Sequence, residues 1–190
     1  MRQKRALFWA AVDEVDPADL VFVDESGADT RLVRTHGRAP PGERAHGSAP
    51  FGSRERLTGV AGLGMEGLLA PRVQEQAMNT AGFLAYLDED LIPTLVEKKP
   101  GAVVVLDNLK PHHATEVRQK LEAAGLGLLY LPPYSPDLAP IERAWSKGKT
   151  LLRTAAARSK DALRTAFEQA MQTVSPEDAG AWFRHAGYPL

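Results

Sequence analysis

The sequence predicts an α/β protein with a mixed five-stranded sheet and helices on both faces of that sheet. Three features support this prediction. Short apolar runs have the length and composition of buried strands, other segments repeat apolar residues at three- and four-residue steps, and Gly or Pro marks most boundaries. In chain order the elements read as three strands, a helix, a strand, a helix, a strand and then helices only, which is typical of layered α/β domains.

The strands are expected where β-branched and aromatic residues gather between turn residues. The first run, Leu20–Val23, leads into Asp24, and the fourth, Ala102–Leu106, leads into Asp107. The two acids would be neighbours if these strands run parallel and adjacent. The predicted strands cover 20–27, 31–35, 57–63, 102–107 and 127–131, and residues 67–70 extend the third one as a meander.

The helices are expected between and after these strands. A helical pattern opens at Asn79, is interrupted by Pro93 and ends at Pro100-Gly101. A second helix covers 115–124, with Gly125 as its stop. The remaining chain is predicted to be helical over 141–153, 160–174 and 176–185.

Length and composition indicate one globular domain. The chain has 190 residues, of which 44% are hydrophobic, enough for one substantial core. We expect an amphipathic lead-in at 1–19, the main domain at 20–153, and C-terminal helices at 154–190 packed on that domain. Acidic residues from Asp13 to Asp16 interrupt the first apolar stretch, so we expect neither a signal peptide nor a membrane span, and a cytoplasmic protein.

The distribution of charge says more than its total. The net charge of −1 does not indicate a nucleic-acid binder, but six arginines fall within 31–56 and seven Lys or Arg residues within 142–164. These stretches adjoin the candidate acids and would suit a polyanion. The alternative is a pair of solvated surfaces, which is the usual role of charged runs.

Three acids are the candidate catalytic residues. Asp24 and Asp107 follow apolar runs, and Glu142 lies two residues after Pro140, a residue suited to the first position of a helix. The chain has no cysteine, so a metal ion would be held by oxygen or imidazole, and carboxylates suit Mg²⁺. The alternative for each acid alone is a cap or turn carboxylate.

Two further acids, Glu25 and Asp137, lie next to the candidate residues in sequence. Alternation along a strand should turn Glu25 away from Asp24, and Asp137 is expected to organise its proline-rich turn.

Several motifs resemble the DDE transposases of the mariner superfamily, in the branch carried by bacterial insertion sequences. The resemblance rests on four blocks in family order, and 34 residues separate Asp107 from Glu142. The blocks are 22–27 (Phe-Val-Asp-Glu-Ser-Gly), 36–44 (His-Gly-Arg-Ala-Pro, then Gly-Glu-Arg), 106–112 (Leu-Asp-Asn-Leu, then His112) and 131–145 (Leu-Pro-Pro-Tyr-Ser-Pro-Asp-Leu, then Pro-Ile-Glu-Arg and Trp145).

The resemblance implies a ribonuclease H-like fold and a two-metal-ion transposase that uses Mg²⁺ or Mn²⁺. By that resemblance Asp24 would bridge both ions, and Asp107 and Glu142 would hold one each. Water would free a 3′-hydroxyl at the element end, and that hydroxyl would attack target DNA. Its implied partners are double-stranded DNA at the element ends and target, a second copy in a dimeric complex, and a helix-turn-helix part from an overlapping frame. Its implied location is the bacterial cytoplasm, at the nucleoid.

One departure from the family pattern concerns Ala139, where the family usually has Asn. If Pro140 is the first helical residue, Ala139 is the N-cap and cannot accept a hydrogen bond there, which costs about 0.5–2 kcal/mol. Two alternatives to a transposase therefore stay open: a ribonuclease H-like nuclease without strand transfer, and an inactive, repurposed DNA-binding or interaction module.

Other residues are expected to support the site or to contact DNA. Asn108 either orients Asp107 or forms an Asx turn, and His112 either hydrogen-bonds near the site or touches DNA. Trp145 is expected to pack in the core rather than stack on a base. The candidate phosphate contacts are Arg38, Arg44, Arg143, Lys147 and Lys149, with a mobile loop or solvated helix face as the alternative.

Overall fold

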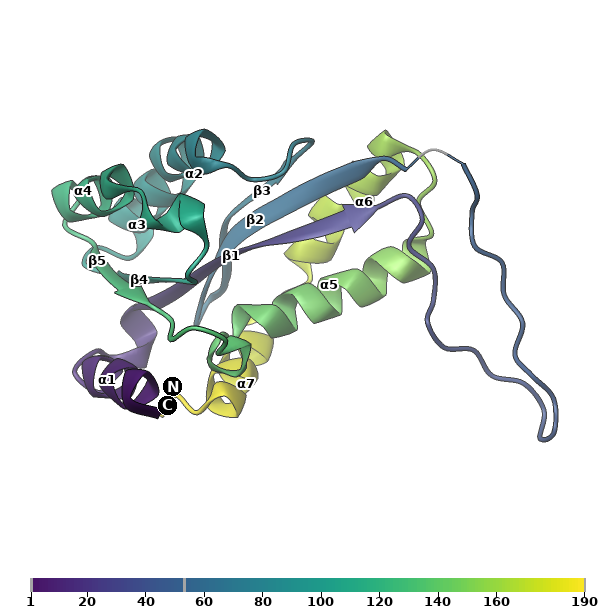
Figure 1. The fold of residues 1–190 in the computed structure, drawn as a ribbon, viewed down its shortest axis with the longest axis horizontal. Coiled ribbons are helices and arrows are strands. Elements are labelled where there is room, and N and C mark those ends of the chain that lie inside the picture. The colour runs from purple at the N-terminus through teal and green to yellow at the C-terminus, as the bar shows by residue number, and fades with distance from the viewer. Residues whose placement is uncertain (1, 53, 190) are drawn as a thin grey trace.

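The computed structural model describes residues 2–52 and 54–189 and contains one mixed five-stranded sheet (Figure 1). The strands lie in the order β3-β2-β1-β4-β5. Strand β1 is antiparallel to β2, which is antiparallel to β3, whereas β4 and β5 run parallel to β1. The predicted fold class is confirmed. The strands are β1 (Leu20–Asp29), β2 (Arg56–Gly64), β3 (Gly67–Gln74), β4 (Val103–Leu106) and β5 (Gly127–Tyr130).

The register between β1 and β4 brings two of the candidate acids together. Phe22 is opposite Val105 in this parallel pair. Asp24 and Asp107 each lie two residues further along, so both belong to the face that Phe22 and Val105 present. Because β4 ends at Leu106 while β1 continues to Asp29, Asp24 lies inside a strand but beyond the end of its parallel neighbour.

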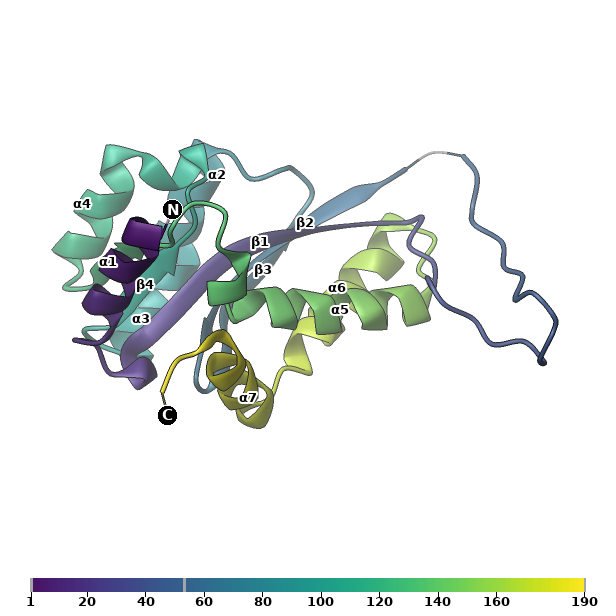
Figure 2. The same cartoon turned by 60° about the horizontal axis from the view of Figure 1, so that its bottom comes forward.

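The predicted strand at 31–35 is wrong. The side chain of Asp29 accepts the backbone N–H of Arg31 at 2.9 Å, and this turn ends β1. Residues 31–52 then run as an extended, almost wholly exposed arm away from the sheet (Figures 1 and 2). The third strand is instead 67–74, which completes the expected number of five.

The helix after Asn79 passes through Pro93 without a break. Helix α2 (Thr80–Tyr86) continues through a π-helical turn (Leu87–Leu91) into α3 (Ile92–Lys98). The N–H of Ile92 bonds to the carbonyl of Leu87, five residues earlier. The wider π turn changes the hydrogen-bond pattern just before Pro93, where a donor is missing.

Helices cover both faces of the sheet. On one face, α2, α3 and α4 (Thr115–Ala123) enclose apolar residues such as Val104, Phe83 and Leu121. On the other face, α1 (Arg2–Val12), α5 (Ile141–Ala155), α6 (Lys160–Gln172) and α7 (Pro176–Ala186) pack around Phe22 and Phe183. Three short 3-10 turns complete the described elements: Pro17–Asp19, Lys110–His113 and Pro136–Leu138.

The N-terminal and C-terminal helices belong to the same core as β1. Phe8 of α1 is buried there, whereas its neighbour Leu7 is 65% exposed. The rings of Phe22 and Phe183 meet edge to face at 5.4 Å. None of the helices in the described parts of the chain is long and apolar enough to cross a membrane.

Candidate active site

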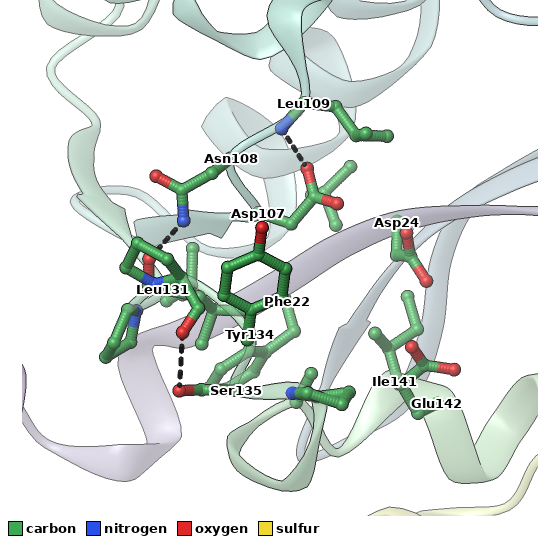
Figure 3. A pocket seen from close by; sticks show the side chains of 16 residues that line it. Phe22, Asp24, Asp107, Asn108, Leu109, Leu131, Tyr134, Ser135, Ile141 and Glu142 are labelled. Atoms are coloured by element: carbon green, nitrogen blue, oxygen red, sulfur yellow. Dashed lines mark hydrogen bonds between the residues drawn. The ribbon is translucent and has the colours of Figure 1, made fainter. Parts of the chain in front are cut away.

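The three candidate acids line one cavity of about 400 Å³ (Figure 3). They come from three separate elements: Asp24 from β1, Asp107 from the end of β4 and Glu142 from the first turn of α5. The rest of the wall is mainly apolar and includes Phe22, Leu131 and Ile141. Such a cavity places polar oxygens beside a largely apolar wall, which is typical of ligand sites.

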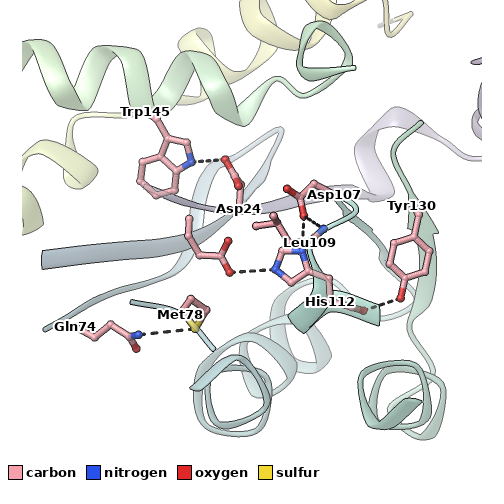
Figure 4. Close-up of polar contacts among 9 residues, drawn as sticks. Asp24, Gln74, Met78, Asp107, Leu109, His112, Tyr130 and Trp145 are labelled. Atoms are coloured by element: carbon pink, nitrogen blue, oxygen red, sulfur yellow. Dashed lines mark hydrogen bonds and ion pairs between the residues drawn. The ribbon is translucent and has the colours of Figure 1, made fainter. Parts of the chain in front are cut away.

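Asp24 is held by a tryptophan from α5. The indole Nε1 of Trp145 donates to Oδ2 of Asp24 at 3.0 Å (Figure 4). Burial is the main cause that raises the pKa of Asp24 to about 7, and the nearby carboxylates of Glu25, Glu142 and Asp107 act in the same direction, against the backbone N–H of Glu25. Without a cation, this carboxyl group is therefore partly protonated near neutral pH.

The pKa of Asp107 is lowered, whereas that of Asp24 is raised. Its Oδ1 accepts the backbone N–H of Leu109 at 2.9 Å and lies 2.6 Å from Nδ1 of His112. Burial alone would raise the pKa of Asp107, but the hydrogen bonds from His112 and Leu109 outweigh burial and lower the pKa. This acid is ionised and has a fixed orientation.

Glu142 is exposed at the start of α5. A carboxylate in the first turn of a helix is favoured by the positive end of the helix dipole. The structure corrects the helix start: α5 begins at Ile141, and Pro140 occupies the N-cap position without a side-chain cap. Ala139, directly before Pro140, is buried with an extended backbone (φ −105°, ψ 97°), and its carbonyl accepts the N–H of Glu142 at 3.2 Å.

The carboxylate oxygens of the three acids are the type of ligand that a hard divalent cation prefers, although the three side chains do not form a complete coordination shell. As they lie, no three His, Asp or Glu side chains within residues 2–52 and 54–189 are close enough together to hold a metal ion. Mg²⁺ needs few protein ligands because it keeps several waters, and the cavity has room for them. A cation would also favour the ionised form of Asp24, whose pKa is raised by burial.

His112 lies directly beside the candidate site and contacts the carboxylates of Asp107 and Glu25. Its side chain is fully buried, and its Nε2 lies 3.1 Å from Oε1 of Glu25. Burial alone would lower the pKa of His112, but the hydrogen bonds with Asp107 and Glu25 raise it to about 9. A fully buried ring cannot touch DNA, so only the hydrogen-bonding alternative for His112 remains.

Two polar residues near the site act differently from the expectation. The side-chain amide of Asn108 donates to the carbonyl of Leu131 at 2.5 Å, so it joins the ends of β4 and β5 rather than orienting Asp107. Asp137 is paired with Arg5 of α1 at 2.5 Å, so it ties α1 to the proline-rich segment instead of organising the turn itself.

Trp145 combines packing with a polar contact. It is 4% exposed, and its ring meets Phe167 of α6 edge to face at 6.5 Å. Core packing was expected, but the hydrogen bond to Asp24 was missed. The sequence places Trp145 one helical turn after Glu142, so the two residues point in a similar direction, but it does not identify Asp24 as the partner.

The candidate DNA contacts fall into two groups. Lys147 is already engaged: its ammonium lies 2.5 Å from Asp178 and 2.7 Å from the carbonyl of Thr173, so we remove it from the set. Arg143 is exposed, and its guanidinium contacts His185. Lys149 is partly exposed on α5, and Arg38 and Arg44 are exposed on the arm.

Comparison with known proteins agrees with the observed fold. A family model described as "DDE superfamily endonuclease" matches residues 19–164. The Mos1 transposase paired-end complex with left transposon end has a TM-score of 0.76 and 20% identity, covering 97% of this chain and 56% of that chain. The catalytic domain of Mos1 mariner transposase has a TM-score of 0.69 and 16% identity, covering 97% of this chain and 83% of that chain.

These structural matches establish a ribonuclease H-like fold for the chain. A shorter sequence match is to histone-lysine N-methyltransferase SETMAR of Homo sapiens, 48% identical over 46 residues, which is 24% of this chain and 7% of that protein. The family model, in contrast, covers most of the chain, including all five strands and α5. The chain therefore belongs to the DDE superfamily endonucleases.

Proposed function

We propose that the chain is the catalytic domain of a mariner-type DNA transposase of the insertion-sequence branch, which cleaves and joins DNA strands. The observation that carries the proposal is the meeting of Asp24, Asp107 and Glu142 at one cavity, in a domain of this family. The family blocks around each acid support the transposase reading over a general nuclease, because a nuclease without strand transfer leaves those blocks unexplained.

The three carboxylates would hold two Mg²⁺ or Mn²⁺ ions. When bound, such ions supply an activated oxygen nucleophile and neutralise charge at phosphorus and at the leaving oxygen. Two structures of the Mos1 transposase catalytic domain contain Raltegravir, one with Mg and one with Mn.

The protein's own groups would set the orientation of the acids. The indole N–H of Trp145 holds Asp24, and the N–H of Leu109 together with His112 holds Asp107. The apolar wall of the cavity would exclude bulk water and so strengthen electrostatic interactions within it. Glu142, on the exposed side, is the acid that substrate DNA would reach first.

Double-stranded DNA at the element ends and target is the proposed partner. The exposed arm carries Arg38 and Arg44, and α5 carries Arg143 and Lys149 beyond Glu142, so positive side chains on two elements are accessible to DNA phosphates. The matched Mos1 structures include a paired-end complex, and on this basis we propose a dimeric DNA complex for this chain as well. A helix-turn-helix part encoded separately would supply recognition of the element ends.

The test is to incubate the protein with Mg²⁺ or Mn²⁺, a pre-cleaved element end and target DNA. Joined products are expected from the wild type, none from Asp107→Asn, and wild-type amounts from Asp88→Asn. Asp88 is a matched control because it is a surface acid paired with Lys120. Cut but unjoined products would favour a nuclease, and no product of either kind would favour an inactive binding module.

A further inference from the structure

Glu25 is the unexpected acid near the site. It follows Asp24 on β1, and alternation along the strand sends the two side chains to opposite faces. Asp24 meets Trp145 of α5, whereas Glu25 meets His112, which lies on the side covered by α2. The Glu25 side chain is only 10% exposed, so its charge is largely removed from water.

His112 connects Glu25 to Asp107. Its two ring nitrogens face two different carboxylates, Nδ1 at 2.6 Å from Asp107 and Nε2 at 3.1 Å from Glu25. The chain of contacts Glu25–His112–Asp107 joins β1 to the end of β4 through one imidazole. Figure 4 shows the contact between His112 and Asp107.

The imidazole is also fixed by its surroundings. Its ring lies 4.3 Å from the ring of Phe83 of α2, and the side chain is fully buried. The hydroxyl of Tyr130 on β5 donates to the backbone carbonyl of His112 at 2.7 Å. The ring therefore cannot turn without breaking several contacts. Because Nδ1 contacts Oδ1 of Asp107, the fixed ring also fixes the orientation of the Asp107 carboxylate.

Glu25 lies at Nε2 of the ring and Asp107 at Nδ1, so Glu25 holds the imidazole from the side away from the candidate metal ligand. Groups that orient the carboxylates and imidazoles of metal sites commonly change metal affinity or activity 10-fold to 100-fold when removed.

We infer that Glu25 is a positioning residue of the active site, which acts through His112 to hold Asp107 in the orientation that binds a divalent cation. This inference rests on the proposed function, because it assumes that Asp107 is a metal ligand. The inference gives a role to Glu25, although the alternation of side chains along β1 turns this acid away from the face that carries Asp24.

The test is a double-mutant cycle read by Mn²⁺ affinity in the absence of DNA. Glu25→Gln is expected to weaken Mn²⁺ binding about 10-fold or more, whereas Glu75→Gln should leave it unchanged. Glu75 is a matched control because it also pairs with basic side chains but lies on the surface. His112→Asn keeps a nitrogen donor near Asp107 but no longer reaches Glu25. In that background, Glu25→Gln should change the affinity less than about twofold, as expected for residues that act through one another.

Two results would overturn the inference: an unchanged affinity in Glu25→Gln, or an equal loss in both backgrounds, which would mean that Glu25 acts directly by its charge. If His112→Asn does not fold, the comparison of Glu25→Gln with Glu75→Gln decides alone, with thermal melting as the control for folding. A wild type that binds Mn²⁺ but neither cuts nor joins DNA would refute the proposed function and leave the result for Glu25 standing. A wild type that binds no Mn²⁺ would overturn the positioning role, whatever its action on DNA.

Discussion

Asp24→Asn should stabilise the metal-free protein at pH 8 and have little effect at pH 4. The pKa of Asp24 is raised from 3.8 to about 7, chiefly by burial. A carboxyl group whose pKa is higher in the folded state contributes stability while it is protonated, below the unfolded value, and that contribution is lost as the pH rises through about 7. Asparagine resembles the protonated form at every pH and can still accept the N–H of Trp145.

The size of the effect follows from the two pKa values. A difference of about 3 pKa units corresponds to about 4 kcal/mol, at about 1.36 kcal/mol per unit. We therefore expect the free energy of unfolding of Asp24→Asn to exceed that of the wild type by about 2–4 kcal/mol at pH 8. Added Mg²⁺ should reduce this difference, because a cation stabilises only the ionised carboxylate of the wild type.

The assay is urea unfolding followed by tryptophan fluorescence, with EDTA present, at pH 4, 6 and 8. The gap between variant and wild type should widen steadily between pH 4 and pH 7. A gap of the same size at all three values would refute the reasoning, since it would show that Asp24 does not titrate in this range.

Three further predictions follow from other contacts at the site. Trp145→Phe removes the donor to Asp24, a charge-assisted bond of about 1.5–3 kcal/mol, so strand cleavage at pH 7 should fall about 10-fold to 100-fold and recover partly at higher pH in a pH–rate profile. Lys147→Met breaks the pair between α5 and α7 and should cost about 0.5–1 kcal/mol in thermal unfolding; a parallel loss of DNA affinity would return Lys147 to the DNA contacts. Arg38→Ala and Arg44→Ala should each weaken DNA binding and reduce its salt dependence by about one counterion, with an unchanged melting temperature because both residues are exposed; an unchanged salt slope would exclude phosphate contacts.

The strands that carry Asp24 and Asp107 were predictable because buried parallel strands are continuous apolar runs, and Val103–Leu106 is such a run. A strand was predicted at 31–35 because Leu32 and Val33 are apolar. The prediction was wrong because β1 ends in a turn at Asp29, and this turn depends on one local hydrogen bond that the apolar pattern does not indicate. The uninterrupted helix through Pro93 depends on a π turn, which the four-residue steps from Leu87 to Leu91 and Leu95 do not distinguish from an ordinary helical turn.

The contacts that shape the site could not be predicted from sequence. Trp145 and Asp24 are 121 positions apart, and His112 and Glu25 are 87 apart. Each pair meets only after the sheet has formed and a helix or turn has packed on one of its faces. Alternation along β1 does predict that Glu25 points away from Asp24, but it cannot identify the partner on the other face.

The central claim is that Asp24, Asp107 and Glu142 bind divalent metal at one cavity. The most direct measurement is a crystal structure of the protein soaked in Mn²⁺, with anomalous diffraction used to locate the ions. We predict anomalous peaks within bonding distance of Asp24 and Asp107, with Glu142 completing the ligands. A peak bound elsewhere with this cavity empty, or no peak at a saturating Mn²⁺ concentration, would contradict the account.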